Sequence, residues 1–332
     1  MAKQSSKKKR RKLIFLYFYL VLVLFILLTV ASYTWFSLSK TPRVSDMYMF
    51  INTKTGLEIS QTPDAEEWVY QLDFREMVDV TAPLRPVTWS DRDQRFYAAV
   101  YGYDGRMTGE WEPLRDERHA NKNTIDGYYI KATFYARSGQ AVAVQLSPAV
   151  EVEEGVQGSG TYLIGYPIWD SENIVHNNGG QGAECAVRIG IRITPVDSEG
   201  IPTGETSTFY IYEPNSNIHP DGTVGYAATP SIDGSAALVD ASHLILQNAS
   251  TWTEADPVQR DVVIKDLGEF TTDTTLFKLE AEEMVKIDLY LWLEGQDVDC
   301  TNEINRAQIL ASIQFSANVE DHSGMRPIEP EE

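Results

Sequence analysis

The sequence predicts an all-β protein, an antiparallel, jelly-roll-like β-sandwich preceded by one N-terminal transmembrane or signal helix. Three observations predict this fold class. Residues 13–31 form one uncharged apolar run, and much of the remaining chain alternates between apolar and polar side chains. The 22 Gly and 15 Pro residues fall largely between these alternating segments. Period-two alternation indicates strands with one buried face, and many such strands separated by turns are typical of sandwiches.

The first twelve residues predict a cytoplasmic tail. They hold seven of the 28 Lys and Arg residues and no acid, which leaves 21 basic against 48 acidic residues, or a net charge of −27, over 13–332. Positive charge stays on the cytoplasmic side of a membrane segment, so the acidic remainder is expected outside the cell. The residues that set this topology are Lys7, Lys8, Lys9, Arg10, Arg11 and Lys12.

Residues 13–31, LIFLYFYLVLVLFILLTVA, predict a helix that inserts in the lipid bilayer. A helix of this length spans roughly 28 Å, close to the thickness of the hydrocarbon core. The run is longer than the usual apolar region of a secretory signal, which favours an uncleaved anchor. Cleavage near Ser32 is the alternative, because Val30 and Ser32 would then occupy the −3 and −1 positions.

Alternation predicts the strands of the extracellular part. The clearest segments are 129–136, 187–193, 285–293 and 309–315, and further strands are expected over 44–51, 67–73, 96–102, 141–147, 207–212 and 261–265. The polar stretch 105–123 is a candidate linker, either between N-terminal strands (32–123) and a main sandwich (124–318) or as a long loop within one domain. Residues 319–332 predict an acidic, disordered tail.

Composition and motifs argue against several function classes. A net charge of −20 argues against nucleic-acid binding, since phosphate contacts need a basic face. The sequence contains no HExxH, G-x-S-x-G or P-loop pattern. We therefore expect no catalysis, with an extracellular hydrolase kept only as a third hypothesis.

The two cysteines and one acidic loop are the candidate sites. Cys185 and Cys300 lie beside strong predicted strands, and an extracellular disulfide between them would close a loop of about 115 residues. Unpaired buried thiols are the alternative. Asp297, Asp299 and Asn302 offer oxygen ligands for Ca²⁺, although the loop lacks the EF-hand pattern and a solvated acidic turn explains it as well. No other cofactor is expected.

Aromatic residues make up 11% of the chain and cluster in stretches such as 68–70, 96–103 and 162–169. They predict either cross-strand packing or a sugar-stacking surface, for which Trp169 is one candidate.

Two segments resemble a known family. Residues 31–37, ASYTWFS, follow the apolar run with small residues and an aromatic-Phe-Ser step, and residues 309–317, ILASIQFSA, form an apolar closing strand. Both are similar to the TasA/camelysin family of secreted matrix and surface proteins of Gram-positive bacteria, although Leu38 stands where that family commonly has an acid. The resemblance implies a jelly-roll-like sandwich, export and, in some members, assembly into fibres by donated N-terminal strands, here the segment 33–50.

We therefore expect a non-catalytic bacterial cell-surface protein with a structural or assembly role. Its expected location is the cell membrane, with a single span and an extracellular C-terminal region, or the exterior after cleavage. Its expected partners are the lipid bilayer through 13–31 and either further copies of itself or other surface proteins. The alternative is a membrane-tethered carbohydrate- or cell-wall-binding module.

Overall fold

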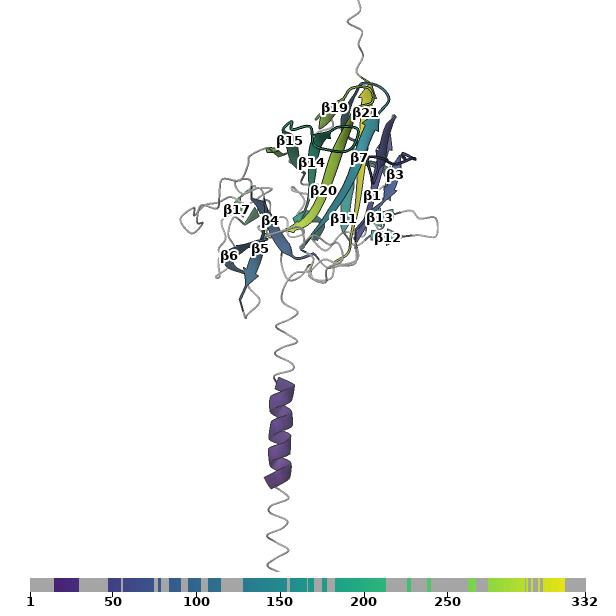
Figure 1. Cartoon of the computed structure of the whole chain (residues 1–332). Helices are drawn as coiled ribbons and strands as arrows, with labels where there is room; N and C mark the ends of the chain where they lie inside the picture. The colour runs from purple at the N-terminus through teal and green to yellow at the C-terminus, as the bar shows by residue number, and fades with distance from the viewer. Residues whose placement is uncertain are drawn as a thin grey trace, which may run out of the picture. The chain divides into compact units, whose positions relative to one another are not determined.

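The computed structural model shows a β-sandwich and, described separately, an N-terminal helix (Figure 1). The structure describes residues 15–29, 47–54, 56–74, 77–78, 84–90, 95–102, 107–114, 128–153, 156–165, 167–169, 175–177, 183–212, 226–227, 238–239, 262–266, 274–295, 297, 300, 304 and 307–319.

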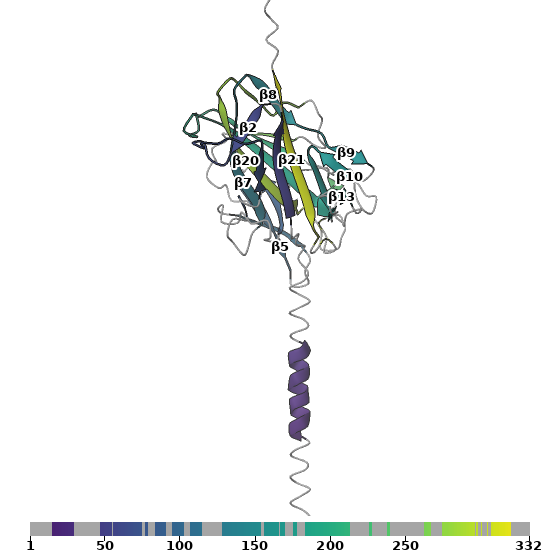
Figure 2. The same cartoon turned by 90° about the vertical axis from the view of Figure 1, so that its right-hand side faces the viewer.

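One layer of the sandwich is the β21 sheet, built around the last strand of the chain. β21 (Ile309–Val319) pairs with β1 (Met47–Lys54) along one side, as Figure 2 shows. Its other side is shared by two shorter strands, first β11 (Tyr162–Gly165) and then β8 (Val142–Leu146). The sheet is completed by edge strands β3 (Gln71–Asp73) and β19 (Phe277–Leu279).

The other layer is the β20 sheet. β20 (Met284–Glu294) lies at its centre and pairs antiparallel with β14 (Val187–Val196) on one side and β7 (Tyr129–Ser138) on the other. The remaining strands of this sheet are β15 (Ser207–Tyr212), β18 (Val262–Asp266), β2 (Leu57–Ser60), β4 (Pro86–Ser90), β5 (Arg95–Tyr101) and β6 (Met107–Pro113).

Two smaller sheets and one short helix complete the described elements. The four-stranded sheet consists of β12 (Pro167–Trp169), β13 (Val175–Asn177), β10 (Val156–Ser159) and β9 (Val150–Glu153). The two-stranded sheet consists of β16 (Tyr226–Ala227) and β17 (Leu238–Val239), and the helix is α2 (Ala183–Ala186).

The main core lies between the two large sheets, and the alternation of apolar residues explains it. In β14, β20 and β7 every second side chain points into this core, as predicted for 187–193, 285–293 and 129–136. β21 adds its own alternate apolar side chains from the opposite layer. Burying an aliphatic side chain contributes about 1.5–3 kcal/mol, so these rows account for much of the stability. The core residues from these four strands include Ile130, Phe134, Ile189, Ile191, Ile287, Leu289, Ile313 and Phe315.

The structure confirms the all-β class and corrects two details of the sequence analysis. The sheets are not purely antiparallel, because β1 runs parallel to β21, β18 to β15, and β4 to β20. The stretch 105–123 is not simply a linker, since β6 lies within it and extends the β20 sheet. Strands before residue 123 pair with strands after it, so the boundary predicted there does not separate two folded units.

The N-terminal helix covers residues 15–29, and all of its side chains are exposed. Within the part of the chain that the structure describes, no helix is both long and apolar enough to cross a membrane. The ends of the predicted span (13–14 and 30–31) and the basic cluster of residues 1–12 lie outside the described residues. So do residues 320–332 of the predicted tail, whereas Val319 ends β21.

Candidate functional site

The outer face of the β20 sheet, opposite the main core, carries the most unusual side chains of the sandwich. Because alternate residues point to opposite faces, the residues between the core positions all face outward here. Pairing in register then places them in rows across β14, β20 and β7. The three central rows are Gly190–Tyr290–Lys131, Arg192–Asp288–Thr133 and Thr194–Lys286–Tyr135.

One end of this face is covered by an aromatic layer from β4 and β5. We define the aromatic layer as Trp89, Phe96, Tyr129, Phe209, Tyr290 and Trp292, all at most 5% exposed. The ring of Phe96 stacks on Tyr129 at 4.2 Å between centroids, and Trp89 meets Phe209 edge-on at 4.7 Å. Such pairs each contribute about 0.5–1.5 kcal/mol beyond the area that they bury. For 96–97 the structure therefore shows packing rather than an exposed sugar platform.

Gly190 makes this close packing possible. A Cβ added at Gly190 would lie 2.6 Å from the ring of Phe209 and 3.0 Å from that of Trp292. The two rings therefore pack directly against the backbone of β14. A glycine in the middle of a strand commonly marks such a close approach.

Arg192 lies beside the aromatic layer, and no described residue is its acidic partner. Its guanidinium carbon is 5.5 Å from the centroid of Phe209, 5.7 Å from Trp89 and 5.8 Å from Tyr290. Among the described residues, its buried Nε has no hydrogen-bond partner, and neither has Nε1 of Trp89. A buried donor without an acceptor typically costs about 1–3 kcal/mol. Two such donors therefore meet at one place on the outer face.

Asp288 is the cross-strand neighbour of Arg192, but its carboxylate is held by other groups. Thr133 Oγ1 donates to Asp288 Oδ1 at 2.6 Å. Lys131 Nζ lies 3.8 Å from Oδ1, and Lys286 Nζ lies 3.5 Å from Oδ2. Burial, followed by the nearby charge of Asp288, raises the pKa of Tyr135. The patch of Arg192, Lys131, Lys286 and Asp288 thus carries two net positive charges in an acidic protein.

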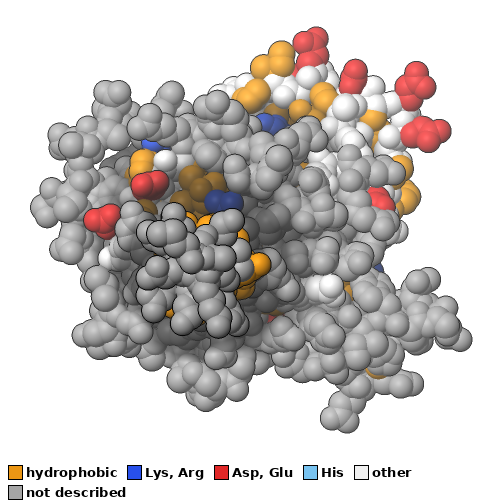
Figure 3. Space-filling view, turned by 90° about the horizontal axis from the view of Figure 1, so that it is seen from below, with side chains coloured by type: hydrophobic (Ala, Val, Ile, Leu, Met, Phe, Trp, Pro, Cys, Tyr) orange, Lys and Arg blue, Asp and Glu red, His pale blue; other side chains and the backbone are white. Residues whose placement is uncertain are grey.

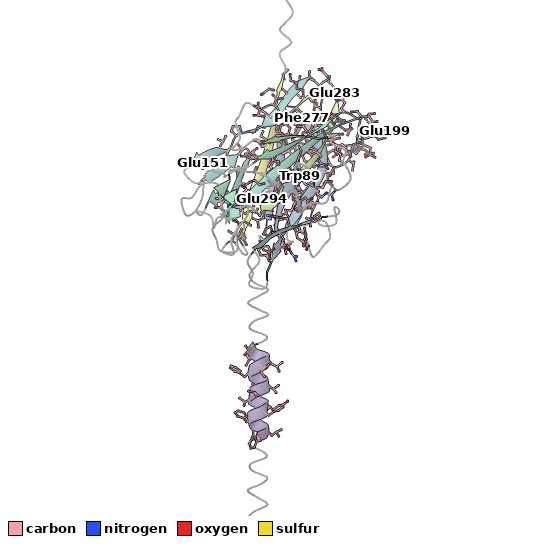
Figure 4. The ribbon with its side chains drawn as sticks, turned by 90° about the vertical axis from the view of Figure 1, so that its left-hand side faces the viewer. Trp89, Glu151, Glu199, Phe277, Glu283 and Glu294 are labelled. Carbon is pink, nitrogen blue, oxygen red and sulfur yellow. The ribbon has the colours of Figure 1, made fainter. Side chains whose placement is uncertain are left out.

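The far end of the outer face is bounded by a surface ion pair and two loops. Arg137 binds Glu58 Oε2 at 3.1 Å and lies 4.2 Å from the ring centroid of Trp68. A Cβ added at Gly200 would lie 3.1 Å from the ring of Tyr135. In Figure 4, Trp89 lies between Glu294 and Glu199 in the view. The polar patch therefore lies between the aromatic layer and these loops.

A buried ion pair closes the sandwich at the end of β20. Nη2 of Arg188 binds Oδ2 of Asp297 at 2.6 Å, and both side chains are fully buried. The Nη1 of Arg188 donates to the carbonyl of Cys185 at 2.8 Å, and Trp292 Nε1 donates to Glu294 at 3.0 Å. Arg188 and Asp297 compensate each other's charge within the core, so this pair is structural in geometry.

The predicted disulfide is absent, because Cys185 and Cys300 are both thiols in the structure. Arg188 contacts the chain beside both cysteines. Its Nη1 contacts the carbonyl of Cys185, and its Nη2 contacts Asp297, whose carbonyl accepts the N–H of Cys300.

The predicted Ca²⁺ ligands are only partly described. Asp297 is paired with Arg188, a contact that competes with a cation for the same carboxylate oxygen, and Asp299 and Asn302 lie outside the described residues. Among the described residues, no group of three or more His, Cys, Asp or Glu side chains is placed to hold a metal ion. The Ca²⁺ site stays a prediction, as does a sugar-stacking role for Trp169, whose side chain is not described.

Sequence reasoning missed the patch around Arg192 although its signal was present. Arg192, Asp288 and Lys131 occupy the polar positions of three strongly alternating strands. The alternation indicates that they share a face of a sheet, but only the strand order brings them into adjacent rows.

Comparisons of the chain with protein-family models, with curated proteins and with solved structures gave no match.

Proposed function

We propose that this chain is a membrane-anchored or secreted bacterial cell-surface protein with a non-catalytic, structural or assembly role. The observation that carries the proposal is the position of β1. The first described strand after the apolar segment pairs with β21 over its whole length and with β3 on its other side. β1 is thus an internal strand of the sandwich, and an anchor at 13–31 would tether the sandwich to a membrane.

Assembly is supported by the same strand. β1 hydrogen-bonds to β21 in parallel, and its partner β3 contributes only three paired residues. A strand near the chain terminus that fills a position inside a sheet is the element that one copy could supply to another. The resemblance to TasA/camelysin proteins points to the same segment, residues 33–50.

Two measurements test the proposal on the full-length chain expressed in a Gram-positive host. Cells are fractionated and the N-terminus of the product is sequenced. A full-length product in the membrane fraction supports the anchor, and an extracellular product beginning near Ser32 supports secretion. The purified product should form oligomers whose population rises with concentration. A cytosolic product would overturn the surface location, and a strictly monomeric product that retains residues 33–50 would overturn assembly.

A membrane-tethered carbohydrate- or cell-wall-binding module is the second candidate. The observation that favours it is the surface beside the outer face, where Tyr70 is 56% exposed and Trp68 is half-buried against Arg137. Exposed aromatic rings of this kind stack on sugars. Binding to purified wall glycan that is lost in a Trp68→Ala, Tyr70→Ala double variant would support this function. Absence of binding across a glycan panel would eliminate it.

A further inference from the structure

We propose that the outer face of the β20 sheet binds a carboxylated sugar, a uronate, with Arg192 as the residue that contacts the carboxylate. The inference goes beyond the structural role proposed above and does not depend on self-association. It rests on the availability of Arg192, on the charge around it and on the hydroxyl groups beside it.

Arg192 is available to bind a carboxylate, whereas the other described arginines on this face are already paired with acidic residues. Of the three described arginines on this face of β14 and β7, Arg188 binds Asp297 and Arg137 binds Glu58. Arg192 contacts three aromatic rings and, in the part of the chain that the structure describes, has no carboxylate partner. Its Nε, like that of Arg188, is buried with no partner among those residues, so the Nη nitrogens form the accessible end of the half-buried Arg192 side chain. This is the end of a guanidinium that binds a carboxylate through two parallel hydrogen bonds.

The surroundings favour an anion. The two positive charges of Lys131 and Lys286 exceed the single negative charge of Asp288. The patch therefore keeps a net positive charge although that carboxylate lies within it. Trp89 is 2% exposed, and its Nε1–H has no acceptor among the described residues, so a second unpaired donor lies beside the guanidinium. The rings against Arg192 also keep the guanidinium in place, which reduces the entropy lost on binding. Figure 3 shows acidic side chains at the upper right and at the left of the view, with basic side chains lying deeper.

The neighbouring side chains suit a sugar better than an acidic peptide. Hydroxyl groups flank Arg192 on the same face, where Thr194 and Ser207 bond to each other at 3.0 Å. Thr133, in the same row as Arg192, and Tyr135, in the adjacent row, add two more hydroxyl groups, of which that of Thr133 already donates to Asp288. These groups match the hydroxyls of a sugar ring. An acidic peptide would instead be expected to pair along a sheet edge, and this site lies within the sheet.

The test uses trigalacturonate as the probe and its fully methyl-esterified form as the uncharged control. Binding to the wild-type protein is measured by calorimetry and by the fluorescence of Trp89 and its neighbours. The expected result is saturable binding of trigalacturonate and binding of the ester that is at least about tenfold weaker, since the carboxylate contacts are charge-assisted. Equal binding of the two probes would overturn the proposal. So would the absence of trigalacturonate binding up to about 10 mM, a concentration that detects even weak binding.

Variants assign the binding to Arg192. Arg192→Gln should weaken binding at least about tenfold, whereas Arg137→Gln, which removes another arginine from the same face, should change it less than about twofold. If Arg192→Gln does not fold, Arg192→Lys keeps the charge and the stem but loses the planar fork, and an intermediate loss is expected. Unchanged affinity in both Arg192 variants would overturn the assignment. Oligo-glutamate that competes with trigalacturonate at equal or higher affinity would overturn the sugar class in favour of an acidic peptide.

Discussion

Arg188 shows how much a single buried ion pair contributes to this sandwich. Its guanidinium is fully buried and binds both Asp297 and the carbonyl of Cys185. Removing one charge leaves the other without compensation in the core, which typically costs about 3–5 kcal/mol. Asp297→Asn should therefore lower the free energy of unfolding by about that amount in urea denaturation.

The matched control is Glu58→Gln, which removes the carboxylate that binds Arg137 on the surface. That pair is about one-third exposed, with side-chain exposures of 39% and 34%, and exposed pairs contribute about 0–1 kcal/mol. Losses of equal size in the two variants would show that Asp297 is better solvated than its burial indicates.

Gly190 is a second residue whose neighbours leave no room for a larger side chain. An alanine there would bring a Cβ within 2.6 Å of Phe209, so the aromatic layer has to move. Gly190→Ala should destabilise the protein by about 1–3 kcal/mol and change the near-ultraviolet circular dichroism of the tryptophans. Gly139→Ala is the control, because its Cβ would meet only Glu282 at an ordinary 3.7 Å. A Gly190→Ala variant as stable as this control would contradict the packing described here.

At the scale of elements, the junction between β11 and β8 depends on one threonine. Both strands pair with the same side of β21, and Thr161 lies between them. Its Oγ1 accepts the N–H of Gln314 at 3.1 Å and donates to the carbonyl of Gln314 at 3.2 Å. The carbonyl of Gln314 also accepts the N–H of Ser147 at 2.7 Å, so the group of β21 that relies on Thr161 is the N–H of Gln314.

Thr161→Val should therefore destabilise the sandwich by about 1–3 kcal/mol, because it keeps the shape and leaves the buried N–H of Gln314 without this acceptor. Amide hydrogen exchange should rise in β21 near residue 314. Thr108→Val, at a partly exposed position of β6, should have an effect below about 0.5 kcal/mol. Unchanged exchange at Gln314 would mean that the backbone alone holds the junction.

The strands that the sequence predicted most clearly are those with long runs of alternating apolar side chains. Segments 129–136, 187–193, 285–293 and 309–315 alternate in this way, and each is a strand of the sandwich. β4 was not predicted, although Val87 and Trp89 alternate with Thr88 and Ser90, because the run covers only four residues after Pro86. Prediction therefore fails where the alternating run is short, and not where both faces are covered, since β20 and β21 are buried over most of their length.

The site was harder to predict than the fold, because it depends on pairing between distant segments. Arg192 and Asp288 are 96 positions apart in the sequence, and the register of β14 and β20 makes them neighbours. The predicted bridge between Cys185 and Cys300, which are free thiols in the structure, also depended on contacts between distant segments. Sequence placed both cysteines beside strong strands, but it gave no sign that Arg188 binds both the carbonyl of Cys185 and the carboxylate of Asp297.

At the scale of the whole molecule, charge sets the conditions for assembly. Residues 13–332 carry a net charge of −27, so two copies repel each other over a Debye length of about 10 Å at 0.1 M salt. If the copies associate through strand pairing and apolar contacts, salt screens the repulsion without weakening those contacts. Association of residues 33–332 should therefore strengthen as ionic strength rises.

Sedimentation velocity of residues 33–332 between about 0.02 and 0.5 M NaCl measures this, since the Debye length falls severalfold across that range. The fraction of oligomer should rise with salt at constant protein concentration. Arg192→Gln separates the assembly proposal from the uronate proposal. The variant removes one positive charge from the sugar-binding patch, so it should weaken uronate binding and leave the salt dependence of association unchanged. Oligomers that instead dissociate as salt rises would show that complementary charges, rather than strands, join the copies.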